Sequence, residues 1–154
     1  MFMTWPLRAK RRITLKVKFM QHPLVLPMLL QIALGFVILL SLAPRRLSAV
    51  KKAGGVKGLR KAGGFSQKLI NHSDNFTNQF EIPVFFFALC LLFIATGTAS
   101  QTAVIAAWVF VVSRIVHTLI QTTNNVIFPN RFVVFLVGVI SLLVMLGVAI
   151  VKAL

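Results

Sequence analysis

Four long apolar runs, separated by polar stretches, dominate the pattern of the chain. They cover about residues 23–43, 74–96, 102–121 and 131–151. At a rise of about 1.5 Å per residue, a helix of about 20 residues crosses the roughly 30 Å hydrocarbon core of a bilayer. The pattern therefore predicts an all-α integral membrane protein in which four transmembrane helices form one membrane domain, residues 23–154.

Helix-breaking and capping residues mark the ends of these runs. Pro44, which two arginines follow, is expected to stop the first helix at the membrane interface. Ser73 or Asp74 suits the N-cap of the second helix, and Gly97 suits its end. Because only a few residues separate the second run from the third, these two helices should form an antiparallel pair.

A basic segment, residues 1–22, precedes the membrane domain. Basic residues ahead of an apolar run are also found in signal peptides, but this run is longer than the roughly 7–15 residues of a signal-peptide core. We therefore interpret residues 23–43 as a membrane span. Translation can start at Met1 or at Met20, and the sequence leaves both open.

Composition and charge agree with a membrane protein. Hydrophobic residues make up 58% of the chain and charged residues only 12%, against about 25% charged residues in a soluble domain. The 17 basic and two acidic residues give a net charge of +15. Most of the basic residues flank the apolar runs, which is typical of segments that rest on anionic lipid. The predicted partner is membrane lipid and not nucleic acid.

The basic residues also predict an orientation. The glycine-rich loop 45–68 carries eight of them and contains a repeat, KKAGG at 51–55 and RKAGG at 60–64. We expect this loop to be flexible and, by the positive-inside rule, cytoplasmic, with both termini on the opposite side. In a bacterium this places the protein in the inner membrane.

Polar residues interrupt the second and third runs in two stripes with helical spacing. The stripes are Asn71, Asp74, Asn78 and Glu81, and Arg114, His117 and Gln121. Glu81 and Arg114 should lie about 10 Å deep, at about 1.5 Å per residue, and their opposite charges predict that they are partners. The two stripes then form a polar pocket that opens to the cytoplasm, with Arg131 at its mouth. A buried ion pair that only locks two helices together is the alternative.

The cysteine, Gln31 and the histidines have simpler interpretations. Cys90 is the only cysteine and lies in an apolar run, so we interpret it as a small buried hydrophobic residue. Gln31 is expected to form an interhelical hydrogen bond. The three histidines are too scattered for a zinc site, and we predict no metal.

Three segments resemble the MAPEG family, the membrane-associated proteins in eicosanoid and glutathione metabolism. Asn78-Gln79-Phe80-Glu81-Ile82-Pro83 is similar to its N-x-x-E pattern, and Arg114-Ile115-Val116-His117-Thr118 is similar to its third-helix R-x-x-H. Pro129-Asn130-Arg131 with Phe135-Leu136-Val137-Gly138 resembles the start of its fourth helix. The resemblance covers about residues 22–152. The form Asp74-Asn75-Phe76 ahead of Asn78 is similar to that of a bacterial branch of the family.

The resemblance implies a left-handed four-helix bundle that assembles as a homotrimer and binds glutathione between subunits near the cytoplasmic face. Asn78, Glu81, Arg114 and His117 would form the glutathione-binding site, and Arg131 would be the catalytic residue that stabilises the thiolate. The implied function is a glutathione-dependent transferase or peroxidase, and the membrane would deliver an apolar electrophile or a lipid hydroperoxide.

The sequence departs from the family's glutathione-using members at two places. Asn71, Ser73 and Asp74 stand where those members carry arginines, and Gln121 stands where they carry a tyrosine. The chain has no tyrosine at all. A non-catalytic member of the family is therefore the main alternative. A proton-coupled transporter that uses Glu81 is a further one, which Arg114 disfavours because it would keep Glu81 ionised.

Overall fold

Six helices make up the described part of the chain. The computed structural model describes residues 21–123 and 130–154, and no strand occurs among them. The expected basic segment up to residue 20, with Met20, and also Pro129 lie outside the described residues. The helices are α2 (Val25–Lys52), α3 (Val56–Lys61), α4 (Gln67–Asn78), α5 (Pro83–Thr96), α6 (Gln101–Thr123) and α7 (Phe132–Ala153).

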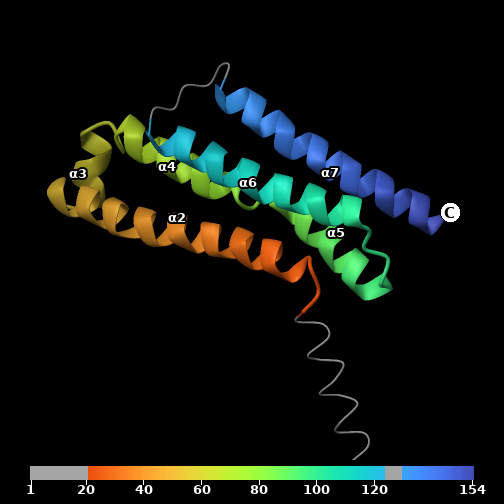
Figure 1. Cartoon of the computed structure of the whole chain (residues 1–154). Coiled ribbons are helices and arrows are strands. Elements are labelled where there is room, and N and C mark those ends of the chain that lie inside the picture. Colours follow the sequence, from red (N-terminus) through yellow and green to blue (C-terminus); the bar gives the residue numbers. More distant parts are fainter. Residues whose placement is uncertain (1–20, 124–129) are drawn as a thin grey trace, which may run out of the picture.

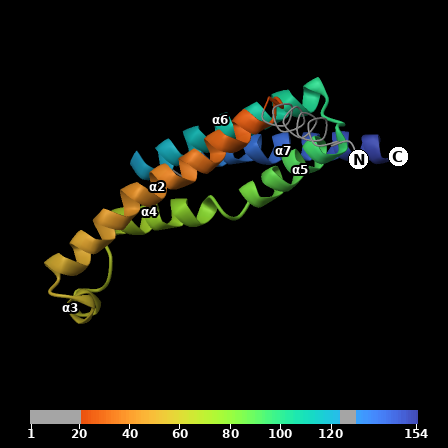
Figure 2. The same ribbon diagram turned by 90° about the horizontal axis from the view of Figure 1, so that it is seen from below.

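Four helical spans in the described residues are long and apolar enough to cross a membrane. They are α2, the α4–α5 segment, α6 and α7. The spans run alongside one another, with α3 at one end of the bundle and the C-terminus of α7 at the other (Figures 1 and 2). The predicted all-α class with four membrane-spanning helices is confirmed.

Exposed apolar side chains cover the outside of the bundle. Val37, Leu40 and Val151 keep 63%, 71% and 73% of their surface exposed. Exposing many such side chains to water would be costly, at about 25 cal/mol for each Å² of apolar surface. Lipid removes that cost, so the outer surface fits the membrane assignment.

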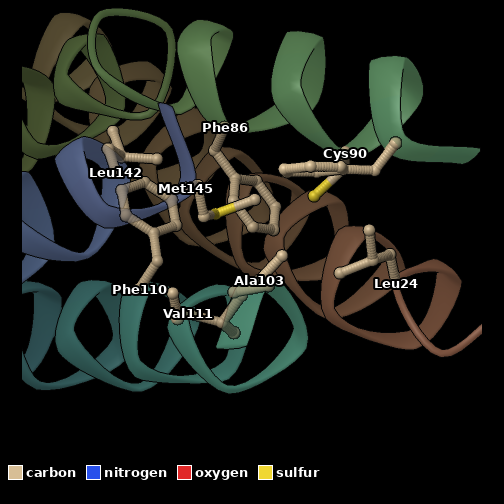
Figure 3. Packing of buried hydrophobic residues seen from close by; sticks show 11 residues of the cluster. Leu24, Phe86, Cys90, Ala103, Phe110, Val111, Leu142 and Met145 are labelled. Carbon is tan, nitrogen blue, oxygen red and sulfur yellow. The ribbon is translucent and has the colours of Figure 1, made fainter. Parts of the chain in front are cut away.

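The apolar core lies where α5, α6 and α7 meet (Figure 3). Phe86 of α5 stacks on Phe110 of α6, with ring centroids 4.7 Å apart. Ala103, Ala106 and Ala107 of α6 are buried, and their small side chains let neighbouring helices pack close to α6. Cys90 is fully buried in this core, which confirms its interpretation as a small hydrophobic residue.

Helix α2 continues past Pro44, so the expectation that Pro44 stops it is wrong. The helix extends to Lys52 and contains Pro44 in its interior. Side chains supply hydrogen bonds beside the proline: the Ser41 hydroxyl donates to the Ile38 carbonyl, and Arg45 Nη1 donates to the Ser41 carbonyl. The carbonyl that loses its helical N–H partner to Pro44 is that of Leu40, four residues earlier, and neither of these two bonds goes to it.

The second span is longer than expected and is broken in the middle. Helix α4 begins at Gln67, ahead of the predicted Ser73 or Asp74, and ends at Asn78. Residues 79–82 are not helical, and Pro83 starts α5. Proline has no N–H, and its ring would clash with the carbonyl four residues earlier, at Gln79. The break therefore places Glu81 in a link rather than on the helical face that carries Asn78.

Helices run through the segment 45–68, which was expected to be one loop. Each copy of the glycine repeat ends a helix: α2 ends at Lys52 and α3 at Lys61, and the glycines that follow have positive φ angles. The hydrogen bonds are also repeated, since Gly55 N–H donates to the Val50 carbonyl and Gly64 N–H donates to the Leu59 carbonyl, both at 2.9 Å. The two KAGG sequences are thus two copies of one helix-ending turn.

The turn between α5 and α6 matches the prediction. Gly97 follows α5 with a φ of 66°, a left-handed conformation that glycine adopts readily. The Thr98 N–H donates to the Phe93 carbonyl and closes the helix end. Residues 97–100 then lead into α6, which makes the two helices antiparallel neighbours.

Candidate functional site

The five residues predicted for the site line one cavity. Its volume is about 280 Å³. It lies where the end of α4, the 79–82 link, α6 and the start of α7 meet. The predicted lining residues are Asn78, Glu81, Arg114, His117 and Arg131, and the sequence did not indicate the apolar ones, Ile82, Phe132 and Phe135.

Arg114 lies deep in the wall of this cavity, with 3% of its surface exposed. Its Nη2 donates to the Asn78 carbonyl at 3.0 Å. Asn78 is the last residue of α4, and the final carbonyls of a helix have no partner within the helix. Arg114 therefore caps α4. Its Nε–H is buried and has no hydrogen-bond partner in the described part of the chain.

His117 lies one turn further along α6 and is also buried. Its Nε2 accepts a hydrogen bond from Arg131 Nε at 3.4 Å. An imidazole nitrogen that accepts a hydrogen bond cannot carry a proton, so we assign the neutral tautomer with the proton on Nδ1. Nδ1 is buried and has no hydrogen-bond partner among residues 21–123 and 130–154. Arg131 and His117 thus hold each other at the edge of the cavity.

The predicted ion pair between Glu81 and Arg114 is absent. Glu81 lines the same cavity and lies within electrostatic range of Arg114. However, Glu81 is exposed, and the hydrogen bond that Arg114 makes is to the Asn78 carbonyl. The reason is the break at 79–82, which removes Glu81 from the helical face assumed in the prediction.

The other residues of the two polar stripes, Asn71, Asp74 and Gln121, do not line the cavity. Gln121 is buried, and its Oε1 accepts a hydrogen bond from Asn78 Nδ2 at 3.1 Å. Asn71 Oδ1 accepts a hydrogen bond from Gln67 Nε2 on the outside of α4. Asp74 is exposed and does not line the cavity. Two of the four residues of the first stripe therefore belong to the site.

A second polar group, which we call the Asn75 cluster, was not predicted as a unit. It consists of Asn75, Gln79, Thr118 and Gln31. Asn75 is fully buried and exchanges two hydrogen bonds with Thr118: Asn75 Nδ2 donates to the Thr118 carbonyl, and Thr118 Oγ1 donates to Asn75 Oδ1. Gln79 Nε2 donates to Asn75 Oδ1 at 3.0 Å.

Gln31 joins this cluster from α2. Its Nε2 donates to Gln79 Oε1 at 2.9 Å, which confirms the predicted interhelical hydrogen bond. Asn75 and Gln79 are one helical turn apart, and that spacing was the signal available in the sequence. The cluster ties α2, α4 and α6 together.

These features define a class: a multi-pass integral membrane protein with a cavity between its helices that Arg114, His117 and Arg131 line. The sequence matches the model of the MAPEG family over residues 24–151, which is most of the chain. The protein belongs to the MAPEG family. In the same comparisons, the chain matched no curated protein and no solved structure.

Proposed function

We propose that this protein is a glutathione-dependent transferase or peroxidase that acts on apolar electrophiles or lipid hydroperoxides. The observation that carries the proposal is the grouping of two guanidinium groups, Arg114 and Arg131, with an imidazole around one cavity. Arg114 Nε–H and the assigned Nδ1–H of His117 have no partner in the described structure. Buried donors of this kind are costly unless an acceptor completes them.

Glutathione is a ligand whose chemistry these donors fit. It carries two carboxylates, which guanidinium groups bind with paired hydrogen bonds, and an ammonium group, which a carboxylate such as Glu81 can bind. Asn78, Glu81, Arg114 and His117 would hold the tripeptide. The cavity volume of about 280 Å³ is close to the lower end of small-molecule sites, about 300 Å³.

Arg131 is the residue to which we assign thiolate stabilisation. Bound glutathione would supply the nucleophilic thiol. A guanidinium beside a thiol favours its ionised form and so raises the fraction of nucleophile at neutral pH. Ile82, Phe132 and Phe135 give the same cavity an apolar wall. That wall suits an apolar second substrate that arrives from the membrane.

A non-catalytic member of the family is the second candidate, and one observation favours it. The Asn78 amide is already engaged by Gln121, the residue at the position of the family's tyrosine. In this case the cavity would hold an unknown small anion, or would only join α4, α6 and α7.

Thiolate formation distinguishes the two candidates. Glutathione added to the purified protein should raise its thermal midpoint, because a ligand that prefers the folded state stabilises it. Thiolate absorbance should then appear and should be abolished by Arg131→Ala. Arg60→Ala removes an exposed arginine of α3 outside the cavity and is the matched control. Unchanged absorbance in Arg131→Ala would exclude this role for Arg131. No midpoint shift in the wild type would favour the non-catalytic candidate.

We also propose that the protein is a homotrimer in a bacterial inner membrane, with segment 45–68 in the cytoplasm. Family membership supports the trimer, and eight basic residues support the orientation. Mass measurement in mild detergent tests the first point, and a finding of monomer alone would contradict it. A reporter fused within 45–68 tests the second, and an external signal would contradict it.

A further inference from the structure

A second cavity, of about 550 Å³, lies between the end of α2 and the start of α4. It shares no residue with the candidate glutathione site. We call it the basic pocket and define it by its polar lining residues, Arg45, Ser48, Lys52, Ser66, Lys68 and His72. It lies at the α3 end of the bundle, where α2 and α4 run side by side (Figures 1 and 2).

The basic pocket has positive charge and no counter-charge. Three of its lining residues are cationic, and Arg45 and Lys68 lie within electrostatic range of His72. The sequence has only two acids, Asp74 and Glu81, and neither lines the pocket. Like charges that share a cavity repel one another, and an anion in the cavity would relieve this repulsion.

His72 provides a buried polar group without a partner. Only 7% of its surface is exposed, yet its Nδ1 has no hydrogen-bond partner in the described part of the chain. Such nitrogens are almost always satisfied by protein, water or ligand. His72 lines the basic pocket, so its ring lies beside any ligand bound there.

The start of α4 adds a third feature that favours an anion. The helix has 12 residues, and its N-cap, Ser66, makes no side-chain capping bond. Ser66 and Lys68 both line the pocket. Unsatisfied N–H groups and the positive end of the helix dipole make such an N-terminus suitable for phosphate.

The pocket lies at the level of lipid headgroups. Helix α2 has 28 residues, or about 42 Å at about 1.5 Å per residue, whereas the hydrocarbon core is only about 30 Å thick. The apolar part of α2 ends near Ala43, so Arg45 to Lys52 extend into the headgroup layer.

We propose that the basic pocket is a binding site for a phosphate group, carried by an anionic phospholipid headgroup or by a small soluble phosphate. Phosphate offers several acceptor oxygens and negative charge, which match the cations, the two serine hydroxyls and the His72 ring. The proposal does not depend on glutathione chemistry, because the two cavities have no residue in common.

The test compares two double variants that remove the same charge from the same segment. Lys52→Gln/Lys68→Gln changes the pocket, and Lys57→Gln/Lys61→Gln changes α3, outside the pocket. All four lysines are exposed, so both variants should fold like the wild type. The full-length protein in mild detergent is titrated with phosphatidylglycerol, with phosphatidylcholine as the zwitterionic control, and separately with inorganic phosphate. Binding is followed by native mass spectrometry and by thermal midpoint.

We expect the pocket variant to bind phosphatidylglycerol or phosphate at least about tenfold more weakly, because a tenfold loss of affinity corresponds to only about 1.4 kcal/mol. The affinity of the α3 variant should change by less than about twofold. Binding of the lipid alone identifies a headgroup site, and binding of inorganic phosphate with the same variant pattern identifies a soluble ligand. Equal weakening in both variants would show diffuse attraction to an anionic surface and overturn the proposal. Absence of binding in the wild type would overturn it too.

His72→Phe gives an independent check. The change keeps an aromatic ring of similar size and removes both ring nitrogens. We expect weaker phosphate binding with no fall in the thermal midpoint of the ligand-free protein, because the Nδ1 atom has no partner to lose within the described structure. Wild-type binding by this variant would remove His72 from the site.

Discussion

The Asn75 cluster and the candidate glutathione cavity both involve α4 and α6, but their hydrogen bonding differs. In the Asn75 cluster the side chains of Asn75, Gln79 and Thr118 bond to one another, and Gln31 joins them from α2. Around the cavity, buried donors of Arg114 and His117 remain without partners in the described residues. The cluster leaves one acceptor, Gln31 Oε1, without a partner in the described residues, whereas the cavity leaves two N–H donors, those of Arg114 Nε and His117 Nδ1, without one.

The difference follows from the side chains that each region uses. Amides and hydroxyls carry both donors and acceptors, so a group of them can satisfy itself. A guanidinium carries five donors and no acceptor. Around the cavity the Asn78 carbonyl accepts from Arg114 Nη2, and the buried Nε–H of the same guanidinium is left without an acceptor in the described residues. A polar group inside a membrane bundle thus indicates a ligand site most clearly when its donors and acceptors do not balance.

The largest effect on stability should come from the Asn75 cluster. Asn75→Leu keeps a side chain of similar size but leaves the groups around Asn75 without their bonds, at about 1–3 kcal/mol for each buried group. We expect the free energy of unfolding in detergent to fall by more than about 2 kcal/mol.

The matched control for that change is Asn71→Leu, which loses a single exposed bond to Gln67 and should stay within about 0.5 kcal/mol of the wild type. Equal losses for the two asparagine variants would show that the Asn75 cluster does not stabilise the bundle. Glutathione binding by Asn75→Leu protein that remains folded should be unchanged.

At the candidate glutathione cavity, a substitution should affect ligand binding more than stability. Arg114→Gln should weaken glutathione binding by at least about tenfold, because a charge-assisted hydrogen bond contributes about 1.5–3 kcal/mol. Its unfolding free energy should change by no more than about 1 kcal/mol, since the lost bond to the Asn78 carbonyl is offset by removal of a buried charge. Calorimetry and detergent unfolding measure the two effects. A large loss of stability with intact binding would make Arg114 a structural residue.

The smallest effect should be the coupling between Glu81 and Arg114. A buried ion pair between them would leave a stranded charge in each single variant. Because no ion pair joins them, the losses in Glu81→Gln and Arg114→Gln should add to within about 0.5 kcal/mol in the double variant. A coupling energy well above this value would show that the two charges pair in the membrane.

The spans and most of the cavity lining could be predicted from local sequence. Apolar runs set the four spans, and helical spacing places Arg114 and His117 on one face of α6, while the packing of α4 against α6 brings Asn78 to the same cavity. The break before Pro83 could also have been predicted, since proline excludes a helical bond to Gln79. Its consequence for Glu81 was missed because the polar stripe was extended through the break.

Two other features are not revealed by helical spacing. Helix α2 continues through Pro44, although a proline also commonly marks the end of a helix. The Asn75 cluster depends on a partner from another helix, Thr118, at a distance of 43 residues in the sequence. Its members look like ordinary polar interruptions until the helices are placed together.

The two helix-ending turns make the segment after the first span modular. The unit is nine residues long, from Val56 to Gly64, and it begins after one glycine pair and ends with the next. A second copy inserted after Gly64 would create only junctions that the chain already contains. We infer that such an insertion would be accepted as one more short helix: far-UV helical signal should rise while the thermal midpoint of the bundle stays the same. A lower midpoint would show instead that the spans themselves fix the length of this segment.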